Sequence, residues 1–381
     1  MVYGSNFSNQ TTECVSNVPT KAERNIKLTA YVLVLLIALT GNILVLYVIS
    51  QTKHVQRNVN FLIVNMVVSD LVIPVFVLPR HIAEILLDAE TQWILTGLAG
   101  KISCKVFTLL QDASMAVSVQ TVVLIGCERL VAVVFPLRVK MITARLRMSL
   151  IASTWIVGAA VFAPYLYVFK LKSSSAGVYC IQSWAPAFEE PKTSKIYTTF
   201  LCVFLMIIPF SLMSVIYAVI VWTLVREKQF LKHVTQGAVY RDKLNRNVLR
   251  MALTVMTMFV ICWAPTNIFI FIVVFVWNYE VPVCEQNLER FRFAAVFLSY
   301  ANSAVNPCIY FAFVKHYRRC IGTAVRNSFL RMSIQSAGKR FTFRRETFEL
   351  TSLSGDKQYN SESNCNVAEI QLVSSKRLRE T

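Results

Sequence analysis

Charged residues are scarce in this chain of 381 residues. Only 16% of the residues are Asp, Glu, Lys or Arg, whereas 55% are hydrophobic and the mean hydropathy is +0.51. Acidic residues are the scarcer kind, with 21 against 39 basic ones. Because soluble proteins cover their surfaces with many charged and polar side chains, this composition excludes an ordinary soluble enzyme.

What the chain has instead is seven long apolar runs. A helix needs about 20 apolar residues to cross the hydrocarbon core of a bilayer, and each run is that long. Lipid cannot satisfy free backbone groups, so the runs are expected to be helices. The sequence therefore predicts an all-α membrane protein with a bundle of seven transmembrane helices over residues 28–314. The runs cover residues 28–52, 58–79, 106–127, 148–169, 196–225, 251–279 and 293–314.

The distribution of basic residues predicts the orientation of the bundle. Cytoplasmic loops carry an excess of Lys and Arg, and here these residues concentrate at 51–57, 129–147, 226–250 and after residue 314. All of these segments lie on one side of the predicted bundle. We therefore expect a multi-pass plasma-membrane protein with an extracellular N-terminus. The net charge of +18 follows from this bias and is not taken as a sign of nucleic-acid binding.

Two other patterns are missing from the sequence. The N-terminus lacks the basic, apolar and small-residue pattern of a cleaved signal peptide, so the first run is expected to act as its own insertion signal. No internal repeat is visible, which disfavours an inverted-repeat transporter. Residues 1–27 are predicted to be an extracellular segment that is glycosylated at the sequons of Asn6 and Asn9.

The cytoplasmic end divides into two predicted parts. Residues 315–325 (KHYRRCIGTAV) are expected to form a short amphipathic helix, helix 8, on the inner leaflet. Within it Cys320 is a candidate site of acylation, with an unmodified thiol as the alternative. Residues 326–381 are rich in polar and charged residues, which predicts a disordered cytoplasmic tail with sites for phosphorylation.

The predicted topology places four of the ten cysteines on the extracellular side, where disulfides persist. Four cysteines allow three pairings. Pairing Cys104 with Cys180 would fasten the 170–195 loop across the mouth of the bundle. Cys14 and Cys284 would then form a second bridge, or Cys14 would stay free.

Polar side chains lie at similar depth inside several of the runs. An ionisable group within a membrane span is a functional-site hypothesis by default, and Asp70 is such a group. Asn302 and Asn306 are four residues apart and so share a helix face. Because hard cations take oxygen ligands, the set is a candidate cage for a sodium ion or a proton, with a structural hydrogen-bond network as the alternative. Its members are Asn42, Asp70, Ser118, Asn302, Ser303 and Asn306.

Two further features indicate a conformational switch. Prolines in five of the runs each remove a backbone hydrogen bond and permit a kink, although prolines also occur where they serve packing alone. Glu128 and Arg129 are adjacent at the inner end of the third run and can pair until the arginine is released. The alternative is an interfacial pair whose side chains reach toward water. The prolines are Pro79, Pro164, Pro209, Pro265 and Pro307.

Short motifs follow one another in order along the runs. They are Gly41-Asn42, Ser69-Asp70-Leu71, Cys104, Glu128-Arg129-Leu130, Trp155, Pro209 with Tyr217, Cys262-Trp263-Ala264-Pro265 and Asn306-Pro307-Cys308-Ile309-Tyr310. Taken in order, over roughly residues 28–325, these motifs resemble those of the rhodopsin-like (class A) G-protein-coupled receptors. Each motif alone is weak, but their order is specific. Glu128-Arg129-Leu130 stands where the family usually has Asp-Arg-Tyr, which keeps the acid and the arginine. No acid stands at the start of the sixth helix, around residues 245–247.

The resemblance assigns roles to these residues. It implies a sodium pocket in which Asp70 is the metal ligand, switch aromatics beneath the bound ligand, and groups that rearrange when the cytoplasmic end opens. It also implies a disulfide between Cys104 and Cys180. The sodium pocket is Asn42, Asp70, Ser118, Asn302 and Asn306. The switch residues are Glu128, Arg129, Tyr217, Phe259, Trp263, Pro265, Pro307 and Tyr310.

Two positions and one missing domain narrow the class of ligand that the resemblance implies. Tyr300 stands where opsins carry the retinal-binding lysine, Gln111 stands where amine receptors carry an aspartate, and no large extracellular domain is expected. Gln111 instead resembles receptors for short amidated peptides of the RFamide, neuropeptide Y and orexin-like groups, since its amide can donate and accept. The 170–195 loop is expected to be a hairpin. Candidate pocket residues, by their depth, are Arg80, His81, Glu84, Thr108, Gln111, Trp184, Asn267, Arg292 and Tyr300.

The expected function is therefore a receptor, not an enzyme, that passes the binding of an extracellular neuropeptide to a heterotrimeric G protein. The implied partners also include arrestin and receptor kinases, which would contact the tail, and no cofactor besides an allosteric sodium ion is expected. One rival is an ion-translocating helical bundle with Asp70 as the carrier carboxylate. The other is a ligand-independent or orphan receptor-like partner protein, which the sequence leaves open.

Overall fold

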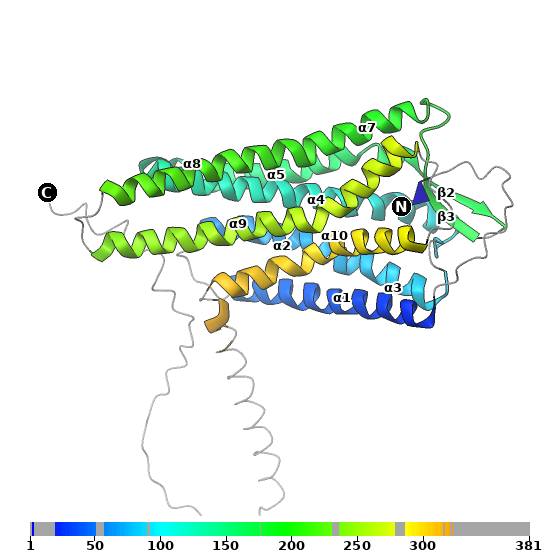
Figure 1. Cartoon of the computed structure of the whole chain (residues 1–381), viewed down its shortest axis with the longest axis horizontal. Coiled ribbons are helices and arrows are strands. Elements are labelled where there is room, and N and C mark those ends of the chain that lie inside the picture. The colour runs from blue at the N-terminus through cyan, green and yellow to red at the C-terminus, as the bar shows by residue number, and fades with distance from the viewer. Residues whose placement is uncertain are drawn as a thin grey trace, which may run out of the picture.

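The computed structural model describes residues 2–3, 20–50, 57–89, 92–175, 177–230, 236–278, 286–314, 317–320 and 322. Most of this part is helical. Long helices run side by side as one bundle, and a small sheet lies at one end of it (Figure 1).

Seven helical spans make up the described bundle, as the apolar runs predicted. Six of them are long and apolar enough to cross a membrane by length and composition. The seventh, α10 (Gln286–Phe313), is 28 residues long, and its asparagines, serines and proline lower its hydropathy. Four spans run without a π-helical turn. They are α1 (Lys21–Ser50), α4 (Gly97–Val134), α5 (Ala144–Phe162) continued by the short α6 (Tyr165–Val168), and α10.

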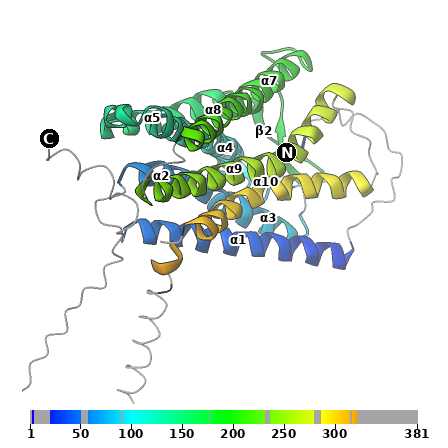
Figure 2. The ribbon, with the colours of Figure 1, turned by 60° about the vertical axis from the view of Figure 1, so that its left-hand side comes forward.

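The other three spans each contain a π-helical turn in the half nearer the sheet. A π turn adds one residue to a helical turn, so side chains beyond it face directions that regular spacing does not predict. Pro74 lies within one such turn and Pro209 follows another, where the missing N–H interrupts the α-helical ladder. The spans are α2 (Arg57–Val72), η1 (Ile73–Val77) and α3 (Leu78–Leu86); α7 (Lys192–Cys202), η3 (Val203–Ile207) and α8 (Ile208–Phe230); and α9 (Gln236–Phe271) with η4 (Ile272–Val276). The turned view in Figure 2 shows α9 and α10 lying along each other.

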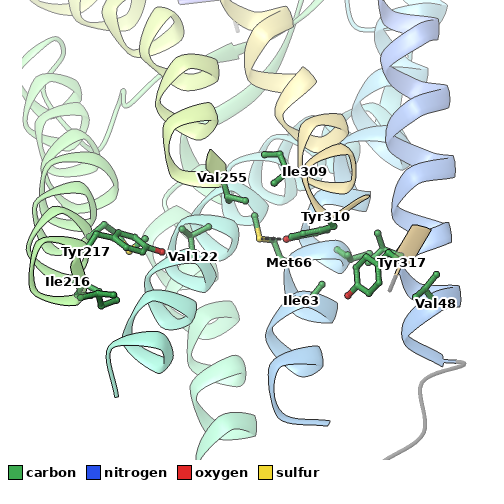
Figure 3. Close-up of a cluster of buried hydrophobic side chains, with 14 of the residues drawn as sticks. Val48, Ile63, Met66, Val122, Ile216, Tyr217, Val255, Ile309, Tyr310 and Tyr317 are labelled. Atoms are coloured by element: carbon green, nitrogen blue, oxygen red, sulfur yellow. Dashed lines mark hydrogen bonds between the residues drawn. The ribbon is translucent and has the colours of Figure 1, made fainter. Parts of the chain in front are cut away.

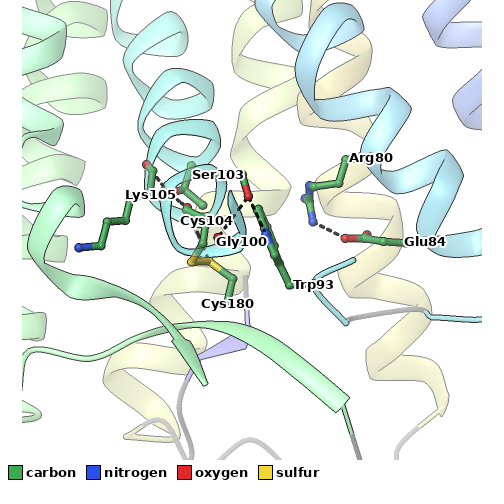
Figure 4. The surroundings of a disulfide bond; sticks show 9 residues. Arg80, Glu84, Trp93, Gly100, Ser103, Cys104, Lys105 and Cys180 are labelled. Carbon is green, nitrogen blue, oxygen red and sulfur yellow. Dashed lines mark hydrogen bonds and ion pairs between the residues drawn. A yellow bond between two sulfur atoms is a disulfide. The ribbon is translucent and has the colours of Figure 1, made fainter. Parts of the chain in front are cut away.

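The loop predicted as a hairpin forms one. Strand β2 (Phe169–Ser174) pairs antiparallel with β3 (Gly177–Gln182), and β1 (Val2–Tyr3) adds to β3 in parallel. The predicted disulfide between Cys104 and Cys180 is present, with the two Cα atoms 5.7 Å apart. It fastens β3 to the first turns of α4, beside Trp93 (Figure 4). The hairpin is thereby held over the end of the bundle.

A single buried side chain joins three of the spans. Asn65 of α2 donates through Nδ2 to Thr121 Oγ1 of α4 at 2.8 Å and to Thr154 Oγ1 of α5 at 3.3 Å. Its Oδ1 accepts from Trp155 Nε1 of α5 at 2.8 Å. The amide thus uses donor and acceptor together, and α2, α4 and α5 are fixed to one another in the bundle interior.

Helices α1 and α10 approach closely at the proline of α10. A Cβ atom at Gly41 would lie 2.9 Å from the Pro307 ring, so only glycine fits there. The next residue, Asn42, donates through Nδ2 to the carbonyl of Ala38 at 2.8 Å and to that of Ser303 at 3.0 Å. The family motif Gly41-Asn42 therefore serves as a contact between the first and seventh spans.

Some predictions lie outside the described residues: glycosylation of Asn6 and Asn9, the Cys14–Cys284 bridge, and the tail at 326–381. Of the predicted helix 8, residues 317–320 and 322 are described and are helical, and the full helix stays a prediction. Cys320 is 3% exposed, and its acylation stays a prediction.

Candidate functional site

A cavity of about 270 Å³ opens between the helices beneath the hairpin. The predicted pocket residues on its wall are Arg80, His81, Glu84, Thr108, Gln111, Asn267, Arg292 and Tyr300. Trp184 is not on the wall. Its side chain is 6% exposed, and its ring packs edge-on against Tyr197 and Phe188, with centroids 5.2 Å and 5.9 Å away. The prediction that Trp184 lines the pocket is therefore wrong, because its large apolar ring packs into an aromatic cluster instead of facing the cavity.

One side of the cavity carries a group of charged and polar residues on α3. Arg80 forms an ion pair with Glu84 one helical turn away, and its guanidinium lies 4.8 Å from the Trp93 ring centroid (Figure 4). Arg80 Nη2 also donates to His81 Nε2 at 2.9 Å. Because arginine only donates, Nε2 of His81 accepts, and its Nδ1–H donates to Glu84 Oε2 at 2.9 Å. Glu84 is thus neutralised by its own helix.

Hydrogen bonds continue from this group across the cavity. Tyr300 OH of α10 lies 3.1 Å from His81 Nε2 and 3.3 Å from Gln111 Oε1 of α4, and its single proton can serve either acceptor. Gln111 Nε2 donates to Asp112 Oδ1 at 3.3 Å. Tyr165 OH of α6 donates to Asp112 Oδ2 at 2.7 Å. A continuous polar chain therefore crosses the cavity from the second span to the fourth.

Asp112 was not predicted from the sequence. It stands inside the apolar run 106–127, it is 7% exposed, and it lines the cavity. Asp112 could have been predicted from the sequence. An ionisable residue within a membrane span marks a candidate functional site, and this applies to Asp112 as it does to Asp70.

The predicted sodium pocket is partly assembled. Asp70 is 3% exposed and accepts from Ser118 Oγ at 3.2 Å and from Asn306 Nδ2 at 2.9 Å. Within the described helices no Lys, Arg or His is among the partners of Asp70, so its charge has no protein counterion. Asn302 is buried but forms no hydrogen bond with Asp70 in the described structure, and Asn42 bonds to α10 backbone instead. A buried carboxylate beside a hydroxyl is a donor set that fits a hard cation.

The predicted switch aromatics stack at the floor of the cavity. Phe259 and Trp263 of α9 both line it, with ring centroids 5.9 Å apart and an angle of 23° between the rings. Phe210 of α8 lies 6.0 Å from Phe259. Trp263 Nε1 is buried and has no hydrogen-bond partner in the part of the chain that the structure describes. Pro265 follows within the same helix.

At the opposite end of the bundle one carboxylate faces two arginines. Glu128 Oε2 lies 3.6 Å from Arg129 Nη2, as the adjacent pair predicted. Its Oε1 lies 3.4 Å from Nε of Arg147, a residue of α5 that is 4% exposed and was not predicted. Neither contact is short, so Arg129 is held loosely and shares its acid with a second cation.

Two tyrosines of the predicted switch lie in the buried apolar cluster of this end. Tyr310 OH of α10 donates to Met66 Sδ at 3.1 Å. Tyr217 OH of α8 is buried and has no hydrogen-bond partner among the described residues. Figure 3 shows the two rings on different helices with their hydroxyls turned inward across the cluster. Neither hydroxyl is bonded to Arg129 in this conformation.

Comparison with known families decides what kind of protein carries this cavity. The family described as "7 transmembrane receptor (rhodopsin family)" matches residues 41–310. The chain belongs to that receptor family. The family resemblance found in the ordered motifs is confirmed, and so is the expectation of a multi-pass membrane receptor instead of an enzyme.

The receptor is also similar to curated proteins. It is 25% identical over 306 residues to the pyroglutamylated RF-amide peptide receptor of Mus musculus, covering 77% of this chain and 68% of that one. It is 27% identical over 323 residues to the QRFP-like peptide receptor of Branchiostoma floridae, covering 82% and 80%. It is 26% identical over 314 residues to neuropeptide FF receptor 1 of Rattus norvegicus, covering 78% and 70%.

Proposed function

We propose that the receptor binds a short, amidated neuropeptide from the extracellular side and passes the binding event to a heterotrimeric G protein. The observation that carries this proposal is the polar chain through Gln111 in the cavity, above the stacked Phe259 and Trp263. The relatives reported above are named as peptide receptors, which supports the proposal of a peptide ligand. The N-terminus is extracellular, the chain lies in the plasma membrane, and its tail recruits arrestin and receptor kinases.

The amide of Gln111 is available to a ligand. Its two hydrogen bonds, to Tyr300 and Asp112, are both 3.3 Å long, whereas strong bonds are about 2.7–2.8 Å for O–H···O and about 2.9–3.0 Å for N–H···O. A terminal amide of a peptide presents the same donor and acceptor as the Gln111 side chain itself. It can therefore replace these long bonds with shorter ones at little cost.

The helix that Gln111 touches carries the signal inward. Tyr300 meets Gln111, Asn306 donates to Asp70, and Tyr310 donates to Met66, all from α10. A ligand that moves Tyr300 therefore acts on one helix that is bonded at three depths. The ligand shifts the equilibrium toward the open cytoplasmic state only through its differential affinity for the two states.

A second-messenger screen of cells that express the full chain tests the proposal. Amidated neuropeptides are applied beside the same peptides as free acids, and cells without the receptor serve as the control. We expect an amidated peptide to signal and its free acid to be weaker. Full signalling without any peptide, unchanged across the panel, would favour the ligand-independent alternative.

Replacing Gln111 with alanine is expected to weaken an amidated peptide by about 1–3 kcal/mol, because a buried polar partner is left unpaired. The measurement is competition binding on membranes, with the free-acid peptide as the matched probe. The free acid should lose much less, since it lacks the amide that Gln111 binds. If both peptides keep their affinity, Gln111 does not contact the ligand.

Replacing Asp70 with asparagine is expected to abolish the effect of sodium on peptide affinity, because the only carboxylate of the pocket is lost. Peptide binding is measured in sodium chloride and in potassium chloride at equal ionic strength. The wild type should differ between the two salts and the variant should not. A variant that still distinguishes sodium from potassium would place the ion elsewhere.

A further inference from the structure

Three carboxylates line the cavity, and their partners differ. Glu84 pairs with Arg80, and Glu289 pairs with Arg292 at 2.6 Å. Within the described chain, Asp112 has only neutral partners, the amide of Gln111 and the hydroxyl of Tyr165. Asp112 is therefore the acid of this cavity whose charge the described helices do not compensate.

The burial of Asp112 makes this lack of compensation costly. The residue is 7% exposed, and a buried charge without a counterion is strongly destabilising. A carboxylate can accept about four hydrogen bonds, and Asp112 accepts two. It thus has free acceptor capacity on a wall that a ligand reaches.

The walls next to Asp112 are aromatic. The ring of Tyr165 meets those of Phe169, Phe162 and Tyr197 edge-on, with centroid distances of 4.7 Å, 5.1 Å and 6.2 Å. All four rings line the cavity. Aromatic faces attract cations, and more strongly when water is excluded. A carboxylate within such walls has the chemistry of a receptor for a guanidinium or ammonium group.

We propose that Asp112 binds a cationic side chain of the ligand, so that the ligand is a basic peptide. This inference rests on the proposed peptide function and names the chemical class of its ligand. Gln111 and Asp112 are bonded to each other. The cation therefore lies close, within the peptide, to the group that Gln111 binds, and Asp112 selects ligands by charge while Gln111 selects them by hydrogen bonding.

The test uses single amino-acid amides, so that it does not depend on knowing the peptide. Thermal unfolding of the purified full-length receptor is followed during titration with L-argininamide and with L-citrullinamide, whose side chain has nearly the same shape but carries no charge. A bound ligand raises the unfolding temperature by mass action. We expect the wild type to bind argininamide on the order of 10-fold more tightly or better, as for a hydrogen bond to a charged group.

Variants of the receptor show which residue causes the preference for argininamide over citrullinamide. Asp112→Asn should bind the two amides equally, whereas Asp112→Glu should keep the preference for argininamide. Asp88→Asn is the matched control, because it removes the same charge from an exposed residue that does not line the cavity. Should Asp112→Asn fail to fold, the wild-type titration still decides, because the proposal requires the wild type to prefer argininamide. Equal binding of the two amides by the wild type, or an undiminished preference in folded Asp112→Asn, would overturn the proposal.

The proposed cation site and the proposed receptor function can be refuted independently of each other. A wild-type receptor that prefers argininamide through Asp112 but responds to no amidated peptide keeps the cation site and loses the amidated-peptide function. A receptor that responds to an amidated peptide but binds both amino-acid amides equally keeps the function and loses the cation site.

Discussion

Replacing Arg129 with alanine is expected to abolish G-protein activation while peptide binding persists. Arg129 does not line the cavity, so its loss removes no ligand contact. Among the described residues its side chain has one ion-pair partner, Glu128 at 3.6 Å, a contact long enough to be released when the cytoplasmic end opens. The measurement is nucleotide exchange on a purified G protein, with peptide binding determined on the same preparation.

Arg147 offers the matched control for this experiment. It is the other arginine on Glu128, so Arg147→Gln removes an equal charge from the same carboxylate. Agonist-driven exchange should survive, and basal exchange should fall because Glu128 then pairs with Arg129 alone. If Arg129→Ala still drives nucleotide exchange like the wild type, or if both variants lose exchange equally, the role assigned to Arg129 is wrong.

Removing the disulfide is expected to destabilise the receptor by about 2–5 kcal/mol and to abolish peptide binding. Cys180 holds β3 over the cavity, and Phe169 and Gln182 of the same hairpin line its wall. Without the bond to Cys104 the hairpin is no longer fixed to α4, and the wall it supplies is lost. A variant with both cysteines replaced by alanine is compared with the wild type by thermal unfolding and by peptide binding.

A free cysteine supplies the control for the disulfide. Cys308 is exposed and unpaired, so Cys308→Ala should change stability by no more than about 0.5 kcal/mol. If the double variant unfolds at the wild-type temperature and still binds peptide, the hairpin does not depend on the bond.

The seven spans were predictable because membrane helices reveal themselves through long apolar runs. Even α10, whose polar residues lower its hydropathy, was recognisable from its ordered motif around Pro307. The hairpin and the Cys104–Cys180 bond followed from family resemblance. These features depend on local composition or on motif order, both of which a single sequence contains.

Contacts between spans were harder to predict. The approach of Arg147 to Glu128 depends on how α5 packs on α4, which no local pattern encodes. The π turns η1, η3 and η4 shift the facing of the residues beyond them, so depth along a helix does not give direction. Trp184, which lies after β3 and not on a helix, was expected in the pocket, but its ring packs against Tyr197 instead of lining the cavity. Asp112 is different, because its charge was visible within an apolar run.

The hydrogen bonds of the Asn65 side chain distinguish one group of helices in the bundle from the rest. This side chain ties α2, α4 and α5 into a unit whose hydrogen bonds would all have to break for those helices to slide. The described helices α8 and α9 instead carry Tyr217 OH and Trp263 Nε1, buried polar groups with no bond to lose and one to gain. We therefore expect α2, α4 and α5 to keep their relative positions when the cytoplasmic end opens, and α8 and α9 to move against them.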